Sequence, residues 1–372
     1  MKKTIVLFAG IALMTAGCTK TEVIRSGTEG TQKGIGFSAY TAKPTKAAQQ
    51  DVTNDNFTSF EVTAIGNNAV YFDNVTFTKA TVWESATKYF WPAFALDFYA
   101  YNTPAKGIFS RDITIAGQTL TFTPSETLSE QEDLVVAKTT GQTEPAGGAT
   151  VLTFSHCLTQ VVVNALSTNS NYTVVVDGVK LANLAGEGTY TFSENKMEAT
   201  AAHKNSATSS DYDEEFTAKT LTASPKEVMR SGDDDGGRWY LIPQDVTSWV
   251  KDSDSEKTNA SHGTYLGLRV KITTTTGDFK VYPRTGDASA WMAIPVPAQL
   301  KFDQGKKYIV TIQFFGESGN GGAGYVDPEK PGDLDGNAET NDAGKKIIGG
   351  AIKFNASVES WDDNTVNVTI NL

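Results

Sequence analysis

The chain has 372 residues, which is enough for two domains of ordinary size after removal of an export signal. Its formal net charge of −11 argues against nucleic acid as a partner, because a surface of this sign repels phosphate. Glycine, threonine, valine and aromatic residues are plentiful, a composition typical of β-proteins.

The N-terminus has the pattern of a secretory signal. Lys2 and Lys3 supply positive charge, and an apolar run at 4–16 follows them. This run is too short to span a bilayer, which needs ~20 apolar residues. It therefore indicates a signal peptide, and the sequence predicts no further segment that crosses a membrane.

Cys18 follows this signal directly. The sequence Thr15-Ala16-Gly17-Cys18 resembles a bacterial lipoprotein box, so we expect a lipoprotein signal peptide at 1–17 and a lipid on Cys18. The alternative is an ordinary cleaved signal with a cysteine placed there by chance. Because Cys157 is the only other cysteine, lipidation of Cys18 predicts a buried free thiol at Cys157 and no disulfide within the chain.

A polar tether at 18–33 separates the expected lipid from the folded part of the chain. It is rich in glycine, serine and threonine and cannot bury enough apolar surface to order itself. Ile35, Phe37 and Ala39 then occupy alternate positions, which predicts the first strand. A loop that contains Lys43 and Lys46 follows this strand.

Short strands separated by turn residues fill the next hundred or so positions. The stretch 96–101 alternates clearly, and 134–137 is wholly apolar, which predicts a buried central strand. A glycine- and proline-containing gap at 141–148 follows. We therefore expect an N-terminal domain at 34–145 and a C-terminal domain at 146–372.

The second half shows the same alternation. Apolar residues occupy every second position at 266–272 and at 308–314, as in antiparallel sheets with one buried face. The polar stretch 200–215 is expected to be a loop. No segment has sustained helical periodicity, and strands recur roughly every 8–15 residues. The sequence thus predicts an all-β fold of two antiparallel β-sandwich domains in tandem.

Residues that could carry chemistry form no recognisable site. His156, His203 and His262 lie far apart in sequence, and neither a catalytic-serine nor a zinc-protease motif occurs. The acidic stretches 233–235 and 327–337 could attract a cation, but solvated turns are the favoured interpretation. We predict no cofactor, no metal site and no enzymatic activity.

The aromatic residues of the first half leave two interpretations open. They could form a platform on which a sugar stacks, or they could form the core of a sandwich, which is commoner. The residues concerned are Trp83, Trp91, Tyr99 and Tyr101.

Several motifs, in their order along the chain, resemble the fimbrillin (Mfa-like) lipoproteins that build type V pili of Bacteroidota. The likeness begins with the lipoprotein leader and extends through nearly the whole chain. The motifs that carry it are Gly34–Tyr40, Tyr89–Pro92, Leu96–Tyr101, Asp133–Ala137, Leu152–His156, Tyr240–Gln244, Gly324–Pro328 and Val358–Trp361.

The resemblance implies two transthyretin-like sandwich domains and export to the outer membrane as a lipidated precursor. In this family a trypsin-like protease removes the leader together with the first strand. The vacated groove then accepts a strand of the next subunit, whose backbone hydrogen bonds give affinity. Ile35, Phe37 and Ala39 would belong to the displaced strand.

The expected processing site is Lys46. Members of the family are commonly cut after arginine, whereas the loop after this first strand offers only Lys43 and Lys46. Pro44 follows Lys43 and disfavours cleavage there, because its ring restricts the backbone and removes an amide hydrogen. Arg25 precedes the strand, so a cut at Arg25 would leave the groove filled.

The C-terminus is the candidate donor strand. Val366, Val368, Ile370 and Leu372 alternate with polar residues up to the last position. A free strand of this pattern is an aggregation hazard unless something covers it. It either fills the groove of a neighbouring subunit or pairs within its own domain, and the sequence gives the two alternatives nearly equal weight.

The leading hypothesis is a structural pilus subunit at the cell surface that supports adhesion. Its expected partners are other pilus subunits, the outer membrane through the lipid on Cys18, and a host or bacterial surface ligand. The alternative is an outer-membrane lipoprotein that binds glycans through Trp83 or Trp91 without polymerising. An enzyme such as a glycosidase has little support.

Overall fold

The computed structural model describes residues 33–41, 51–79, 83–146, 148–200, 209–231, 236–250, 263–316, 321–337, 342–349, 352–361 and 368–371. Within these ranges the fold is all-β, and the 3₁₀ turn η1 (Leu128–Glu130) is the only helical element. No helix among the described residues is long and apolar enough to cross a membrane. The predicted all-β class is confirmed.

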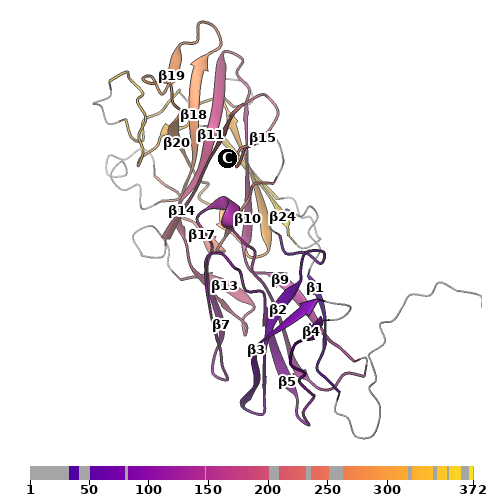
Figure 1. Cartoon of the computed structure of the whole chain (residues 1–372). Helices are drawn as coiled ribbons and strands as arrows, with labels where there is room; N and C mark the ends of the chain where they lie inside the picture. The colour runs from indigo at the N-terminus through magenta and orange to yellow at the C-terminus, as the bar shows by residue number, and fades with distance from the viewer. Residues whose placement is uncertain are drawn as a thin grey trace, which may run out of the picture.

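A sheet that closes into a barrel forms one end of the elongated molecule (Figure 1). Every pairing in it is antiparallel except that of β1 with β9, which is parallel. Its strands, in order around the barrel, are β1 (Phe37–Thr41), β4 (Trp83–Ser85), β3 (Ala69–Lys79), β2 (Ser59–Gly66), β5 (Leu96–Tyr101), β8 (Val135–Gln142) and β9 (Thr150–His156).

Strand β9 begins beyond residue 145, the expected end of the N-terminal domain, and yet pairs with β1 and β8. Leu152 and Phe154 on this strand are buried in the barrel core, which explains the pairing. The barrel sheet therefore extends to His156, and the next strand, β10 (Thr159–Ser167), belongs to a different sheet.

Two further sheets share one apolar core at the other end of the molecule (Figure 1). One contains β15 (Lys226–Glu227), β10, β22 (Lys306–Phe314), β24 (Lys353–Ser360) and β25 (Val368–Asn371), with β16 (Trp239–Leu241) beside β10. The other contains β14 (Ser209–Thr220), β11 (Tyr172–Ala185), β18 (Tyr265–Thr274), β20 (Ala290–Pro295) and β23 (Tyr325–Val326), with β19 (Lys280–Tyr282) beside β18.

The alternating patterns of the second half become the central strands of these sheets. β18 and β22 cover the predicted stretches 266–272 and 308–314, and their alternate apolar residues are buried. The expectation of a loop at 200–215 is wrong from residue 209 onward, where β14 pairs with β11. Tyr212 and Phe216, four positions apart on one face, supply the buried apolar positions of β14, and a strand with one solvent face needs few such residues.

A smaller sheet combines strands from both halves of the sequence. It consists of β13 (Lys196–Ala199), β12 (Gly188–Thr191), β7 (Gln118–Thr123) and β6 (Ile108–Ile113). Its core joins residues of the barrel, such as Tyr101, to Tyr240 and Trp361 of the second half. The pair β17 (Gln244–Asp245) and β21 (Lys301–Phe302) completes the strands of the described chain.

Candidate functional site

Strand β1 closes the barrel but is bound unequally on its two sides. Against β9 it pairs along its whole length, with Phe37–Thr41 opposite Thr150–Phe154. Against β4 its register contains the single pair Phe37 and Trp83. Parallel pairing is slightly less stable per residue than antiparallel pairing. β1 is therefore attached to the sheet mainly along one edge, by the weaker kind of ladder.

The side chain of Phe37 connects β1 to the barrel core. It is 2% exposed, and its ring makes edge contacts with Phe77, Phe98 and Phe60 at centroid distances of 4.7, 5.2 and 6.1 Å. Ile35 is also buried, and Ala39 is partly buried against the same core. Loss of β1 would therefore uncover both an aromatic groove and the edge of β9.

The residues before β1 continue its attachment. The Ile35 N–H donates to the Tyr89 carbonyl at 2.7 Å, and the Trp91 N–H donates to the Lys33 carbonyl at 3.1 Å. Gly34 forms an isolated antiparallel bridge with Phe90. Strand β4 is short, and these contacts with residues 89–91 lie beyond its end. The groove occupied by β1 therefore also holds the residues that precede β1.

At the other end of β1, the side chain of Asn54 adds to the ladder with β9. Asn54 Oδ1 accepts the Thr41 N–H at 2.7 Å, and Asn54 Nδ2 donates to the Thr41 carbonyl at 3.1 Å. One amide group thus satisfies both backbone groups of the last residue in the strand. Asn54 takes the place that a neighbouring strand would have there.

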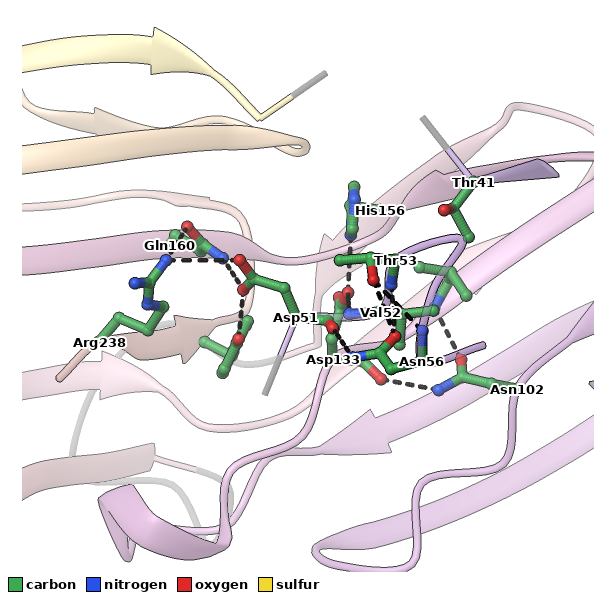
Figure 2. Close-up of polar contacts among 12 residues, drawn as sticks. Thr41, Asp51, Val52, Thr53, Asn56, Asn102, Asp133, His156, Gln160 and Arg238 are labelled. Atoms are coloured by element: carbon green, nitrogen blue, oxygen red, sulfur yellow. Dashed lines mark hydrogen bonds and ion pairs between the residues drawn. The ribbon is translucent and has the colours of Figure 1, made fainter. Parts of the chain in front are cut away.

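Asp51 fixes the chain directly after the segment 42–50, which contains Lys46 and lies outside the described residues (Figure 2). Its carboxylate is buried and accepts hydrogen bonds from Gln160 and from the Tyr240 hydroxyl. Arg238 Nη1 lies 3.4 Å from Asp51 Oδ2. A buried carboxylate needs such partners to offset its lost hydration. All three partners belong to the second half of the sequence.

The next residue is tied to the barrel. The Val52 N–H donates to Asp133 Oδ2 at 3.2 Å, and this oxygen lies 2.7 Å from His156 Nδ1 (Figure 2). The His156 ring stacks on Trp361 with a centroid distance of 4.0 Å. The interpretation of His156 as a packed, hydrogen-bonded histidine is confirmed. The chain after Lys46 is thus held by contacts that do not involve β1.

The structure places the predicted site residues in three groups. Ile35, Phe37 and Ala39 lie in or directly before β1 and in the barrel core. Val368 and Ile370 lie in β25, which pairs antiparallel with β24 opposite Val358 and Ala356. Cys18, Lys46, Val366 and Leu372 lie outside the described residues.

The aromatic platform interpretation is wrong. Trp83 and Trp91 are 8% and 4% exposed, and Tyr99 and Tyr101 are also buried. Stacking on a sugar requires an open ring face, which none of the four offers. Their rings fill the barrel core and the core beneath the smaller sheet.

Cys157 agrees with its prediction, since it is a free and fully buried cysteine. Burial, and secondarily the charge of Asp133, raises the pKa of its thiol well above the ordinary range. A protonated, enclosed thiol is unreactive.

One acidic cluster includes residues of the acidic stretch 327–337 that the sequence analysis singled out. Carboxylate oxygens of Asp333, Asp335 and Asp342 lie within 4.8 Å of one another. The Lys345 ammonium already pairs with Asp342 at 2.6 Å, and Asp333 accepts the Gly336 N–H within the turn. These contacts are those of an acidic turn. The stretch 233–235 lies outside the described residues.

Asp51, Asn54 and Arg238 are site residues that the sequence did not reveal. Asp51 and Arg238 are separated by 187 positions, and no motif surrounds either residue. The only sequence signal is that Arg238 immediately precedes the apolar run at 239–242, where a lone charge would need a buried partner.

Residues 32–326 match the profile of a protein family described as fimbrillin-like. No curated protein sequence matches the chain at a significant level. A solved fimbrilin (FimA) from Porphyromonas gingivalis W83 is 10% identical, with a TM-score of 0.46 over 90% of this chain and 98% of its own. A proposed cell adhesion protein from Bacteroides uniformis ATCC 8492 is 15% identical, with a TM-score of 0.45 over 89% and 99%. The fimbrial anchor protein Mfa2 from Porphyromonas gingivalis is 11% identical, with a TM-score of 0.33 over 76% and 91%.

Proposed function

Because the chain belongs to the fimbrillin-like family, we propose that it is a structural subunit of a cell-surface pilus, assembled by exchange of β1 for a strand of a neighbouring subunit. The family is a structural one, in agreement with the prediction that this protein is not an enzyme. Its membership also implies a place in a fimbrium at the cell surface, with other pilus subunits as partners.

The position of β1 is the observation that carries the proposal. β1 packs on the aromatic core of the barrel, lies beside a short strand on one side, and directly precedes the segment 42–50, which contains Lys46. Asp51 and Val52 fix the chain after that loop through contacts of their own. A cut after Lys46 would leave β1 held by non-covalent contacts alone. The chain from Asp51 onward would keep its own contacts with the rest of the protein.

The proposed sequence of events begins with export and attachment of lipid to Cys18 at the outer membrane. A trypsin-like protease then cuts after Lys46, and residues 1–46 leave with the lipid. The candidate donor strand of a neighbour, with Val366, Val368, Ile370 and Leu372, enters the groove in place of Ile35, Phe37 and Ala39. Main-chain hydrogen bonds to β9 would be remade by the new strand.

The estimated gain from burial and the estimated cost of association are of similar size in this exchange. Burial of the four apolar donor side chains contributes on the order of 6–12 kcal/mol, at about 1.5–3 kcal/mol each. Association costs about 4–15 kcal/mol in lost translational and rotational freedom. The backbone ladder and other contacts between subunits must therefore supply the remaining affinity, which suits an exchange that starts only after proteolysis.

N-terminal sequencing of fimbrial material sheared from cells tests the processing step. We expect assembled subunits to begin at Ala47. Lys46→Gln should accumulate as an uncut precursor that forms no polymer, whereas the matched variant Lys43→Gln should assemble normally. Polymers that begin at Cys18 or Ser26, or normal assembly of Lys46→Gln, would refute the proposed mechanism.

Labelling with palmitate tests the export route separately. Wild-type precursor should incorporate the label, and Cys18→Ala should not. Equal labelling of the two proteins would show that Cys18 is not the lipid attachment site, whatever the result at Lys46.

A further inference from the structure

A buried lysine in the second half of the chain contacts two carboxylates. Lys180, on β11, has a side chain that is 2% exposed, and its Nζ lies 2.8 Å from Oδ2 of the fully buried Asp327. The same nitrogen lies 3.8 Å from Glu329 Oε2 and donates a hydrogen bond to the Tyr265 hydroxyl at 2.9 Å. An amine and a carboxyl group are thus held in direct contact away from solvent.

The fold makes room for this contact at Gly267. Gly267 lies opposite Lys180 in the ladder between β11 and β18, and a methyl group there would lie 3.1 Å from Lys180 Cε. The lysine side chain can therefore cross β18 toward Asp327. The rings of Tyr265 and Trp291 flank the ammonium, with centroids 4.9 and 5.4 Å from Nζ. The site is enclosed by aromatic side chains.

The two oxygens of Asp327 have different surroundings. Oδ1 accepts the backbone N–H groups of Glu329 and Lys330, each at 2.8 Å, and the Tyr265 hydroxyl lies 3.4 Å away. Oδ2 faces the amine of Lys180. Two amide donors aimed at one oxygen are the arrangement that stabilises negative charge in an acyl-transfer intermediate. The other oxygen is left in the position of a leaving group.

We propose that Lys180 and Asp327 condense into an intramolecular amide bond, with Glu329 as the proton relay. Burial of an ammonium and a carboxylate carries a desolvation penalty that their attraction only partly offsets. A neutral amide removes both charges from the interior. The two reacting groups are also already oriented by the sheet, which removes most of the entropic barrier of a reaction between separate molecules.

The reaction balances without any co-reactant. A proton passes from the Lys180 ammonium to Asp327 Oδ2, which gives a neutral amine and a carboxylic acid. The amine nitrogen attacks Cγ, a C–N bond forms, and the negative charge on Oδ1 is held by the Glu329 and Lys330 amides. Glu329 takes a proton from the nitrogen and returns it to the Oδ2 hydroxyl. The Cγ–Oδ2 bond breaks, and one water molecule leaves.

The bond would tie together parts of the sheet that are not neighbours. Two strands, β18 and β20, lie between β11 and β23, which directly precedes Asp327. A covalent link across them would hold the sheet closed when the chain is pulled. The amide bond does not depend on how β1 is processed. A test of the bond is therefore separate from a test of the pilus proposal.

Peptide mapping of the full-length folded protein tests the bond. We expect trypsin to leave Lys180 uncut, and tandem mass spectrometry to find a linked pair of peptides whose mass is their sum minus one water. Fragmentation must place the link between Lys180 and Asp327. Recovery of only unlinked peptides, with normal cleavage after Lys180, would overturn the proposal.

Matched variants identify the roles of the individual groups. Lys219 is a second buried lysine, and its ammonium donates to the backbone carbonyl of Glu227. Lys180→Met should abolish the linked peptide pair, whereas Lys219→Met should retain it. Glu329→Gln should slow its appearance in protein harvested at successive times after synthesis. An unchanged rate in Glu329→Gln would overturn the relay role, and a link that survives Lys180→Met would overturn the assignment of the bond.

Discussion

Phe37 concentrates the contact between β1 and the barrel core in one side chain. Its ring meets three other phenylalanine rings, whereas Tyr40 on the same strand is 55% exposed. Both residues share the backbone ladder of β1, but only the Phe37 side chain lies in the groove. A comparison of the two therefore measures what the groove contributes to stability.

Phe37→Ala should lower the free energy of unfolding of the uncut barrel by about 3–5 kcal/mol, because it removes a large side chain from a closed core. Tyr40→Ala should change it by no more than about 0.5 kcal/mol, as is usual for exposed positions. Urea unfolding followed by tryptophan fluorescence measures both, since Trp83 and Trp91 lie in the same core. Equal losses in the two variants would contradict the role given to Phe37.

Residue-level predictions from sequence succeeded where a local pattern decides the outcome. Phe37 and His156 lie in alternating strands, and both are buried as expected. The polar partners were not predictable, because Asp51 meets Gln160 and Arg238 only after folding brings distant segments together. The sugar platform failed for a related reason: composition reveals aromatic residues, and only packing reveals whether a ring face is open.

Strand β1 depends on Asn54 at its C-terminal end. Asn102 makes two bonds of the same kind elsewhere in the barrel, where it accepts the Val135 N–H and donates to the carbonyl of a second residue, Asp133. The two asparagines are therefore matched in chemistry and differ in which strand end they hold.

Asn54→Ala should destabilise the end of β1 by about 1–3 kcal/mol, from two hydrogen bonds worth about 0.5–1.5 kcal/mol each. Hydrogen–deuterium exchange should then accelerate in the peptide that covers β1, and release of residues 1–46 after cleavage should be faster. Asn102→Ala should instead accelerate exchange at the start of β8. If the β1 amides of Asn54→Ala exchanged as slowly as those of the wild type, the Asn54 side chain would not be what stabilises the end of β1.

Element boundaries followed from sequence wherever apolar residues alternate strictly, as in β18 and β22. β14 was missed because few apolar residues mark it, although Tyr212 and Phe216 suffice for one buried face. The partner of β9 could not be read from its sequence at all. The alternation of Leu152 and Phe154 predicts a strand but is silent on which sheet it joins.

On the scale of the whole molecule, the contact of Asp51 with Arg238 links the chain just after the proposed cleavage site to strands of the second half. Both side chains are buried, at 0% and 5% exposure. Such a buried ion pair adds little to the free energy of unfolding. Removal of one partner lowers this free energy strongly, because the other charge is left buried.

Arg238→Met should therefore lower the free energy of unfolding by about 3–5 kcal/mol, because it removes the Arg238 guanidinium from beside the buried Asp51 carboxylate. The double variant Asp51→Asn with Arg238→Met should recover a substantial part of this loss. Denaturant unfolding of the wild type, both single variants and the double variant gives the coupling energy directly. Strictly additive losses would mean that the two residues do not act as a pair.

β25 lies at the end of its sheet, and this place bears on the proposed role of the C-terminus as a donor strand. β25 pairs with β24 and ends the strand order of its sheet, while β24 is also paired with β22 along its length. A terminal strand with one partner can leave with the loss of one ladder, and the sheet behind it stays paired. This position is compatible with pairing at rest and with donation to a neighbour, and we propose that the two alternatives left by the sequence are successive states of one strand.

Deletion of residues 365–372 should then yield a folded, exported and protease-cut monomer that no longer polymerises. The matched variant Thr369→Ser with Asn371→Ser keeps Val366, Val368, Ile370 and Leu372 and should assemble as the wild type does. Size-exclusion chromatography of cut protein and electron microscopy of sheared material measure both. A truncated chain that misfolds would mean that β25 serves its own sheet alone, because a donor strand must be dispensable to the subunit that gives it. Normal polymers from the truncated chain would place the donor elsewhere in the sequence.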